Sequence, residues 1–162
     1  MGLDMFLKRK TYVKNWDFMT SENHEVTVKL NGNDHPYIDL KKVTYVEEEV
    51  GYWRKVNAIH RWFVDNCQDG RDECQESYIS IEQIKELYDI CKQIQADHNL
   101  AELLPPQEVF FFGDIDEWYF HGIDDTIEQL EPLIKLNEEL EAKKKSGELV
   151  YDWPEYFYRA SW

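Results

Sequence analysis

Apolar residues recur with two different periods along this chain, and the change of period constrains the fold more than any other feature of the sequence. Near the N-terminus, Leu3, Met5 and Leu7 alternate with other residues, and residues 26–30 alternate in the same way before a turn at residues 31–33. A period of two predicts β-strands, because successive side chains of a strand point to opposite faces.

From about Glu47 the apolar spacing changes to three and four residues. Val50, Trp53 and His60 fall on this spacing, which is typical of an amphipathic helix that turns once every 3.6 residues. The pattern predicts a helix that begins near Glu47 and ends before Gly70.

Two further helices are predicted in the second half of the chain. Residues 80–83 read Ser-Ile-Glu-Gln, which is a capping-box pattern, and an apolar stripe follows it from Ile81 to Ile94. A last helix is expected to open at residues 124–126 and to close at Gly147, with Pro132 as a kink or an interruption.

The remaining apolar segments predict strands. Residues 38–46 are a candidate strand, residues 109–112 read as a short central strand, and the aromatic tail 149–162 reads as a final strand near a sheet edge on its Pro154 side. Together these elements predict a single α+β domain over residues 1–162. In it, a mixed or antiparallel sheet packs against about three helices.

The charge balance narrows the classes of partner. The chain of 162 residues has 18 Lys and Arg against 33 Asp and Glu, a formal net charge of −15. The first fifteen residues contain four of the cations and a single carboxylate, Asp4. The net charge of the remaining residues is therefore −18. This net negative charge disfavours direct binding to nucleic acid or to an anionic membrane, and it favours a partner protein with a basic surface.

The three cysteines, an odd number, indicate a reducing compartment. No apolar run approaches the roughly 20 residues of a membrane-spanning helix. The segment from Asp65 to Glu76 has the spacing of a calcium loop, but Cys67 stands at its third ligand position, where a hard cation needs an oxygen. No metal and no cofactor are expected, and the oligomeric state is left open.

Two sets of residues are candidates for function. The first combines carboxylates with aromatic side chains, as a protein-recognition patch does. It comprises Asp114, Asp116, Glu117, Trp118, Tyr119, Asp124, Asp125, Trp153 and Tyr156. The second gathers cations and an imidazole that could bind a small molecule or a nucleotide in a cleft. It comprises Tyr52, Arg54, Lys55, His60 and Arg61.

Several short motifs spread over the chain resemble a family of small, mostly uncharacterised phage and prophage proteins. They are Met-Gly-Leu-Asp-Met at 1–5, Tyr-Trp-Arg-Lys at 52–55, Asn-Ala-Ile-His at 57–60, Trp-Phe-Val at 62–64, Phe-Phe-Phe-Gly at 110–113 and Tyr-Arg-Ala-Ser-Trp at 158–162. The resemblance implies a phage product that acts in the cytoplasm of an infected bacterial host. This chain has Val109 and Asp114 where family members tend to have Gly and Ser around the Phe run.

These observations lead to two main hypotheses, and a virion or assembly component remains open as a third. The first is an acidic binding protein that inhibits or redirects a host nucleic-acid-handling or defence protein, in the manner of an anti-CRISPR and as a possible nucleic-acid mimic. The alternative is a small-molecule or nucleotide-binding protein, or an enzyme, that uses the cleft of the second set. No nucleophile motif or phosphate-binding loop is present in the sequence, which favours binding over catalysis.

Overall fold

A four-stranded antiparallel sheet forms the centre of the protein, with the strand order β4-β1-β6-β5. The computed structural model describes residues 2–18, 23–107, 114–151 and 153–162. The strands of this sheet are β1 (Asp4–Tyr12), β4 (Tyr45–Arg54), β5 (Ser77–Ile79) and β6 (Glu155–Ser161). A separate small hairpin pairs β2 (Lys29–Leu30) with β3 (Asn33–Asp34).

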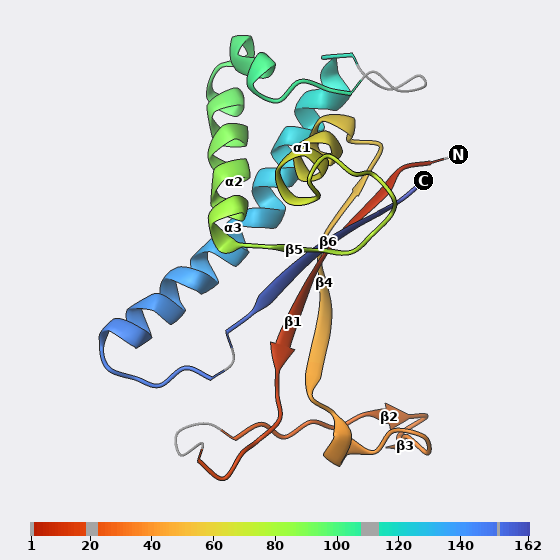
Figure 1. The fold of residues 1–162 in the computed structure, drawn as a ribbon, viewed down its shortest axis with the longest axis vertical. Helices are drawn as coiled ribbons and strands as arrows, with labels where there is room; N and C mark the ends of the chain where they lie inside the picture. Colours follow the sequence, from red (N-terminus) through yellow and green to blue (C-terminus); the bar gives the residue numbers. More distant parts are fainter. Residues whose placement is uncertain (1, 19–22, 108–113, 152) are drawn as a thin grey trace.

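Three α-helices pack on one face of the sheet, at the end of the molecule where the two termini lie (Figure 1). They are α1 (Asn57–Cys67), α2 (Ile81–Ala96) and α3 (Glu117–Lys145), with short 3-10 helices at Leu40–Lys42 (η1) and His98–Leu103 (η2). The predicted α+β class, with an antiparallel sheet against three helices, is confirmed.

Aromatic rings join the sheet to the helices in the core. The inner face of the sheet carries Met5, Trp53 and Tyr158, all almost fully buried. Phe63 of α1 stacks on Tyr158 with ring centroids 3.9 Å apart, and the Trp53 indole donates a hydrogen bond of 3.0 Å to Thr126 of α3. Burial of these rings supplies much of the hydrophobic stabilisation of the domain.

The prediction of a helix that begins near Glu47 is wrong for its first ten residues, 47–56. Residues 45–54 form strand β4, and α1 begins only at Asn57. A register shift opposite Leu7 and Lys8 of β1 disturbs the strict alternation of β4, and a bulge of this kind makes a strand mimic a longer period. The helix at Ser80 is confirmed, with both hydrogen bonds of its capping box present.

The last helix, α3, is longer than the sequence predicts. Helix α3 begins at Glu117, seven residues before the predicted start, and it continues through Pro132. Glu128 and Pro132 are both exposed, so water can satisfy the carbonyl that loses its helical donor.

Three predicted strands also change. Residues 38–46 form η1 and the start of β4, and only Lys29–Leu30 of the segment 26–30 is a strand. Strand β6 lies between β1 and β5 instead of at an edge. Pro154 precedes its first residue and so removes no ladder hydrogen bond. The strand expected at 109–112 lies outside the described residues.

The cations of the N-terminal segment are neutralised across the sheet. Lys8 pairs with Glu47 at 2.9 Å, and this hydrogen bond raises the pKa of Lys8 and lowers that of Glu47. Arg9 holds both carboxylate oxygens of Glu48, at 2.8 to 2.9 Å. The basic start of the chain therefore lies against its own acidic strand.

One amide from α3 closes part of the free edge of β4. The side chain of Gln129 accepts from the backbone N–H of Tyr52 at 2.5 Å and donates to the Tyr52 carbonyl at 3.0 Å. These are the two bonds that a neighbouring strand would make. They fix the end of β4 against α3, next to the cleft described below.

Candidate functional site

A cleft opens where the end of β4, the start of α1 and the first turns of α3 meet. Its volume is about 870 Å³. Residues from both predicted sets line it. The lining residues are Tyr52–Ala58, Pro106, Asp114, Asp116, Trp118, Tyr119, His121, Gly122 and Asp125.

Local backbone features shape this cleft. Lys55 adopts a positive φ of 60° between β4 and α1, a conformation that few residues other than glycine adopt. Asp116 caps α3 by accepting from the Tyr119 N–H at 3.0 Å. At Gly122 a Cβ atom would meet a methyl group of Val56 at 2.6 Å, so glycine allows α3 to approach the start of α1 closely.

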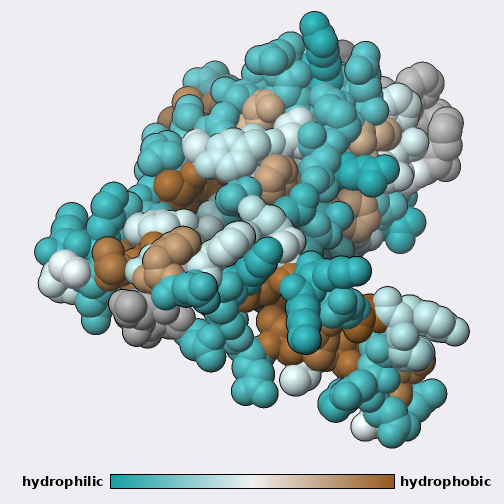
Figure 2. Space-filling view, turned by 60° about the horizontal axis from the view of Figure 1, so that its bottom comes forward, coloured by the Kyte–Doolittle hydropathy of each residue, from teal (hydrophilic) through white to brown (hydrophobic). Residues whose placement is uncertain are grey.

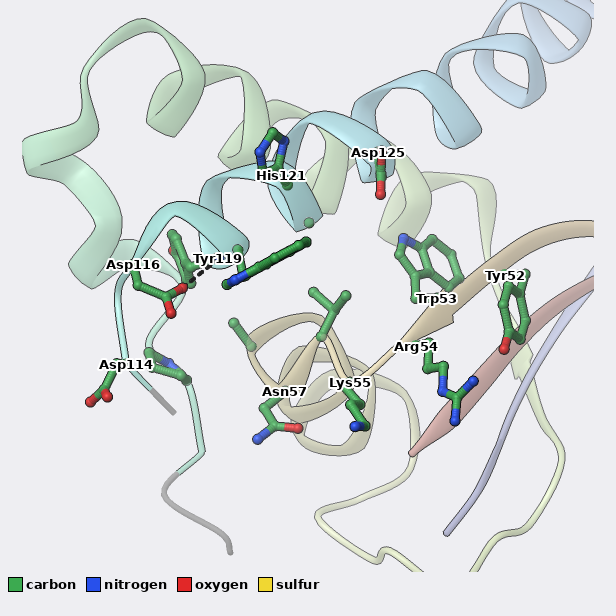
Figure 3. Close-up of a pocket in the computed structure, with 15 residues that line it drawn as sticks. Tyr52, Trp53, Arg54, Lys55, Asn57, Asp114, Asp116, Tyr119, His121 and Asp125 are labelled. Atoms are coloured by element: carbon green, nitrogen blue, oxygen red, sulfur yellow. Dashed lines mark hydrogen bonds between the residues drawn. The ribbon is translucent and has the colours of Figure 1, made fainter. Parts of the chain in front are cut away.

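The two sides of the cleft carry opposite charges. Figure 3 shows Arg54 and Lys55 at the junction of β4 and α1, and Asp125 on α3 across from them. Asp114 and Asp116 lie together farther along, before α3 begins. The basic side belongs to the predicted ligand-binding set, and the acidic side belongs to the predicted partner-binding set.

Carboxylates continue from the cleft along the exposed surface of α3. Residues separated by three, four or seven positions share one face of a helix. Glu117, Asp124 and Glu128 therefore form one exposed stripe, and Trp118 and Asp125 form the adjacent stripe toward the cleft. We call this surface the acidic end, made up of Asp114, Asp116, Glu117, Trp118, Asp124, Asp125 and Glu128.

No Lys or Arg interrupts this part of the sequence. Between Lys92 and Lys135 there are ten Asp and Glu residues and no Lys or Arg. Lys135 instead pairs with Glu131 at 3.3 Å, beyond the acidic end. His121 of α3 lies 3.8 Å from a carboxylate oxygen of Glu117, and no Lys or Arg of this segment neutralises the other carboxylates of the acidic end.

Trp118 stands exposed within these carboxylates. Its side chain is 79% accessible, and its ring lies 5.9 Å from that of His121. An exposed indole costs solvation free energy in a free protein, and tryptophan is among the side chains that contribute most to protein interfaces. This residue is the strongest single sign of a contact surface at the acidic end.

Three other members of the predicted partner-binding set do not join this surface. Tyr119 is buried, with its hydroxyl donating to the carbonyls of Ala101 and Leu104 at 3.1 and 3.0 Å, and burial raises its pKa to about 12. Tyr156 is buried in the sheet core. Trp153 is half-buried near Lys144, at the other end of α3.

Two members of the predicted ligand-binding set lie outside the cleft. His60 is buried, with Nδ1 2.8 Å from the Tyr158 hydroxyl and Nε2 2.9 Å from a carboxylate oxygen of Asp72. Arg61 faces Asp65 at 3.4 Å. The expectation that His60 shares a cleft with Arg54 is therefore wrong, because its ring is buried between Tyr158 and Asp72. Arg61 does not line the cleft, but it donates a hydrogen bond of 3.5 Å to the carbonyl of Pro106, which does.

The sequence reasoning missed His121, Glu128 and the start of α1 at residues 56–58. Glu128 lies eleven positions after Glu117, or three helical turns, so a correct start for α3 would have placed it on the same stripe. The sequence pattern does not indicate the start of α1, because it predicts one helix that already begins near Glu47.

Within the described residues, no group of three or more His, Cys, Asp or Glu side chains is placed to hold a metal ion. Burial raises the pKa of both the Cys67 and the Cys91 thiols to about 12. Neither thiol is an activated nucleophile, because the thiolate is the reactive form. None of the helices in the described part of the chain has the length and apolar character of a membrane span.

Comparison with protein-family models, with curated proteins and with solved structures finds no match. Functional inference therefore rests on the geometry of the cleft and of the acidic end.

Proposed function

We propose that the protein binds another protein and that its acidic end occupies a basic surface on that partner. One observation carries this proposal: Trp118 is exposed in the middle of carboxylates that no Lys or Arg of the same segment neutralises. An indole supplies contact area and the surrounding carboxylates supply steering and orientation, so together they suit a basic protein surface.

The charge spacing of the acidic end favours one type of basic surface. Four carboxylates of the acidic end lie on α3 between Glu117 and Glu128, over a helical rise of roughly 16 Å. The mean separation between these charges is roughly 5.5 Å, compared with about 3.4 Å along a single nucleic-acid strand and about 1.7 Å along a duplex. This separation is closer to that of a single strand than to that of a duplex, so we expect a partner whose basic groove holds a single strand.

The resemblance to phage proteins suggests where the partner is found. We expect a nucleic-acid-handling or defence protein in the cytoplasm of a bacterial host, inhibited or redirected as an anti-CRISPR would do it. In this proposal the protein competes with nucleic acid for the partner and does not bind nucleic acid itself.

The proposal is tested by capture from bacterial lysate on the immobilised protein. We expect a host protein that is retained at about 50 mM NaCl, released at about 500 mM NaCl, and displaced by a single-stranded oligonucleotide. Trp118→Ala should weaken binding of that partner at least about 30-fold, the loss typical of a central interface residue.

A matched pair of charge variants completes this test. Asp124→Asn with Asp125→Asn and Glu128→Gln should weaken binding at least about tenfold. The control removes the same charge from three exposed carboxylates beyond the acidic end, as E138Q, E139Q and E148Q, and should bind normally. Equal losses in both triple variants, or no host protein retained at low salt, would overturn the proposal.

The cleft supports a second candidate function, which is binding of a small anionic ligand. Arg54 and Lys55 line a cleft of about 870 Å³ beside the start of α1, where cations favour phosphate or carboxylate groups. Arg54→Gln with Lys55→Gln should abolish any binding of inorganic phosphate or a nucleotide, measured by calorimetry. If the unaltered protein binds neither probe at millimolar concentration, this candidate is rejected.

A further inference from the structure

The described residues 13–18 and 23–46 form an arm outside the domain core. In Figure 1 the ribbon of β1 and β4 runs away from the helices and ends in this arm, which carries β2, β3 and η1. None of its thirty described residues, 13–18 and 23–46, is buried. A two-stranded hairpin without a core is at best marginally stable in water, so the conformation of the arm needs an additional contact.

The arm also exposes a large share of the apolar side chains. Fifteen large hydrophobic residues are exposed in the described chain, and eight of them belong to the arm. They are Trp16, Phe18, Leu30, Tyr37, Ile38, Leu40, Tyr45 and Val46. Figure 2 shows apolar side chains gathered in one area at the lower part of the molecule, where the arm lies. Contiguous apolar surface of this kind marks a contact site.

The charge of the arm differs from that of the remaining chain. Residues 13–46 contain four lysines and five Asp or Glu residues, a net charge of −1, which leaves −14 of the chain's −15 for the other residues. Two copies of the acidic part repel each other. The arm is the part through which two copies can approach without that repulsion, because it carries both signs almost equally.

Size and symmetry also favour a second copy as the occupant. A stable interface involves about 20–30 residues on each side, and the arm offers thirty. In a two-fold dimer each patch meets itself and must be complementary to itself, which a nearly neutral, apolar patch satisfies. The carboxylates that follow the arm directly, Glu47 and Glu48, are paired with Lys8 and Arg9, and repulsion between exposed charges farther apart than the Debye length of about 8 Å is largely screened.

We propose that the arm is a homodimer interface, in which the arms of two copies pack on each other through their exposed apolar side chains. The interface is separate from the acidic end, so either proposal can fail without the other. The dimer and the partner complex are also expected to respond in opposite directions to salt concentration. Salt screens repulsion between the acidic parts and should strengthen the dimer, but it should weaken partner binding at the acidic end.

Sedimentation equilibrium of the full chain tests the dimer. The chain has a mass of 19.5 kDa, and we expect a species of twice this mass that dissociates on dilution and forms more readily at higher salt. Leu30→Asp with Ile38→Asp should raise the dimer dissociation constant at least tenfold. Folding should be retained in far-UV circular dichroism, because neither side chain is buried.

A matched control separates the arm from general surface hydrophobicity. Leu103 and Ile115 are exposed to 44% and 50% and lie outside the arm. Leu103→Asp with Ile115→Asp makes the same chemical change and should leave the dimer intact. A chain that stays monomeric at about 100 μM in high salt would overturn the proposal, and so would a dimer that only the control pair dissociates.

Discussion

Replacing Phe63 with alanine is expected to lower the free energy of unfolding by about 3–5 kcal/mol. Phe63 is fully buried, stacks on Tyr158 at 3.9 Å, and contacts the rings of Trp53 and Trp62 at 5.9 and 5.4 Å. Truncation leaves a cavity between rigid rings that cannot collapse into it. Such a loss is a large part of the 5–15 kcal/mol that a typical domain possesses.

Urea denaturation measures this change as a shift of the midpoint with an unchanged slope. Leu149→Ala is the control, because Leu149 is 60% exposed and its truncation should change stability by less than about 0.5 kcal/mol. A loss below about 1.5 kcal/mol for Phe63→Ala would contradict the packing of α1 on β6.

Replacing His60 with alanine is expected to lower the free energy of unfolding by about 2–4 kcal/mol, although His60 lies outside the cleft and the acidic end. His60 connects the hydroxyl of Tyr158 to Asp72, which also accepts from the Trp162 indole at 3.0 Å. Removal of the imidazole leaves a fully buried hydroxyl without its partner, which costs about 1–3 kcal/mol, and it also leaves a cavity.

A double-mutant cycle with Tyr158→Phe identifies the cause of this loss. If the orphaned hydroxyl matters, the double variant should be more stable than the sum of the two single losses predicts, by about 1–3 kcal/mol. Additive losses would contradict the link between His60 and Tyr158. Undiminished binding of the captured partner by folded His60→Ala would agree with the position of His60 in the core.

The sequence predicted elements whose signal is local. The capping box at Ser80 and the stripe that follows it specify α2, because both hydrogen bonds form within four residues. The alternation of Met5 and Leu7 likewise indicates an inner face for β1. The exposure of the carboxylates from Asp114 to Asp125 follows the general rule that unpaired charges stay in contact with water, which needs no knowledge of distant residues.

The features that the sequence did not predict depend on contacts between distant residues. Glu47 reads as a helix-starting residue until it is paired with Lys8, 39 positions earlier. His60 reads as a ligand-binding residue until Tyr158 is placed beside it, 98 positions later. The exposure of Trp118 and the burial of Tyr119, which are adjacent in sequence, are set by where α3 meets η2.

The contact between Gln129 and Tyr52 has a consequence for how the protein behaves when concentrated. A bare strand at a sheet margin is a template on which further chains can add and grow into filaments. Here a side-chain amide already fills the donor and acceptor of one residue at that margin, and three consecutive glutamates precede it. Addition of another strand at the Tyr52 end of β4 therefore has to displace Gln129, and the glutamates disfavour it along the preceding residues.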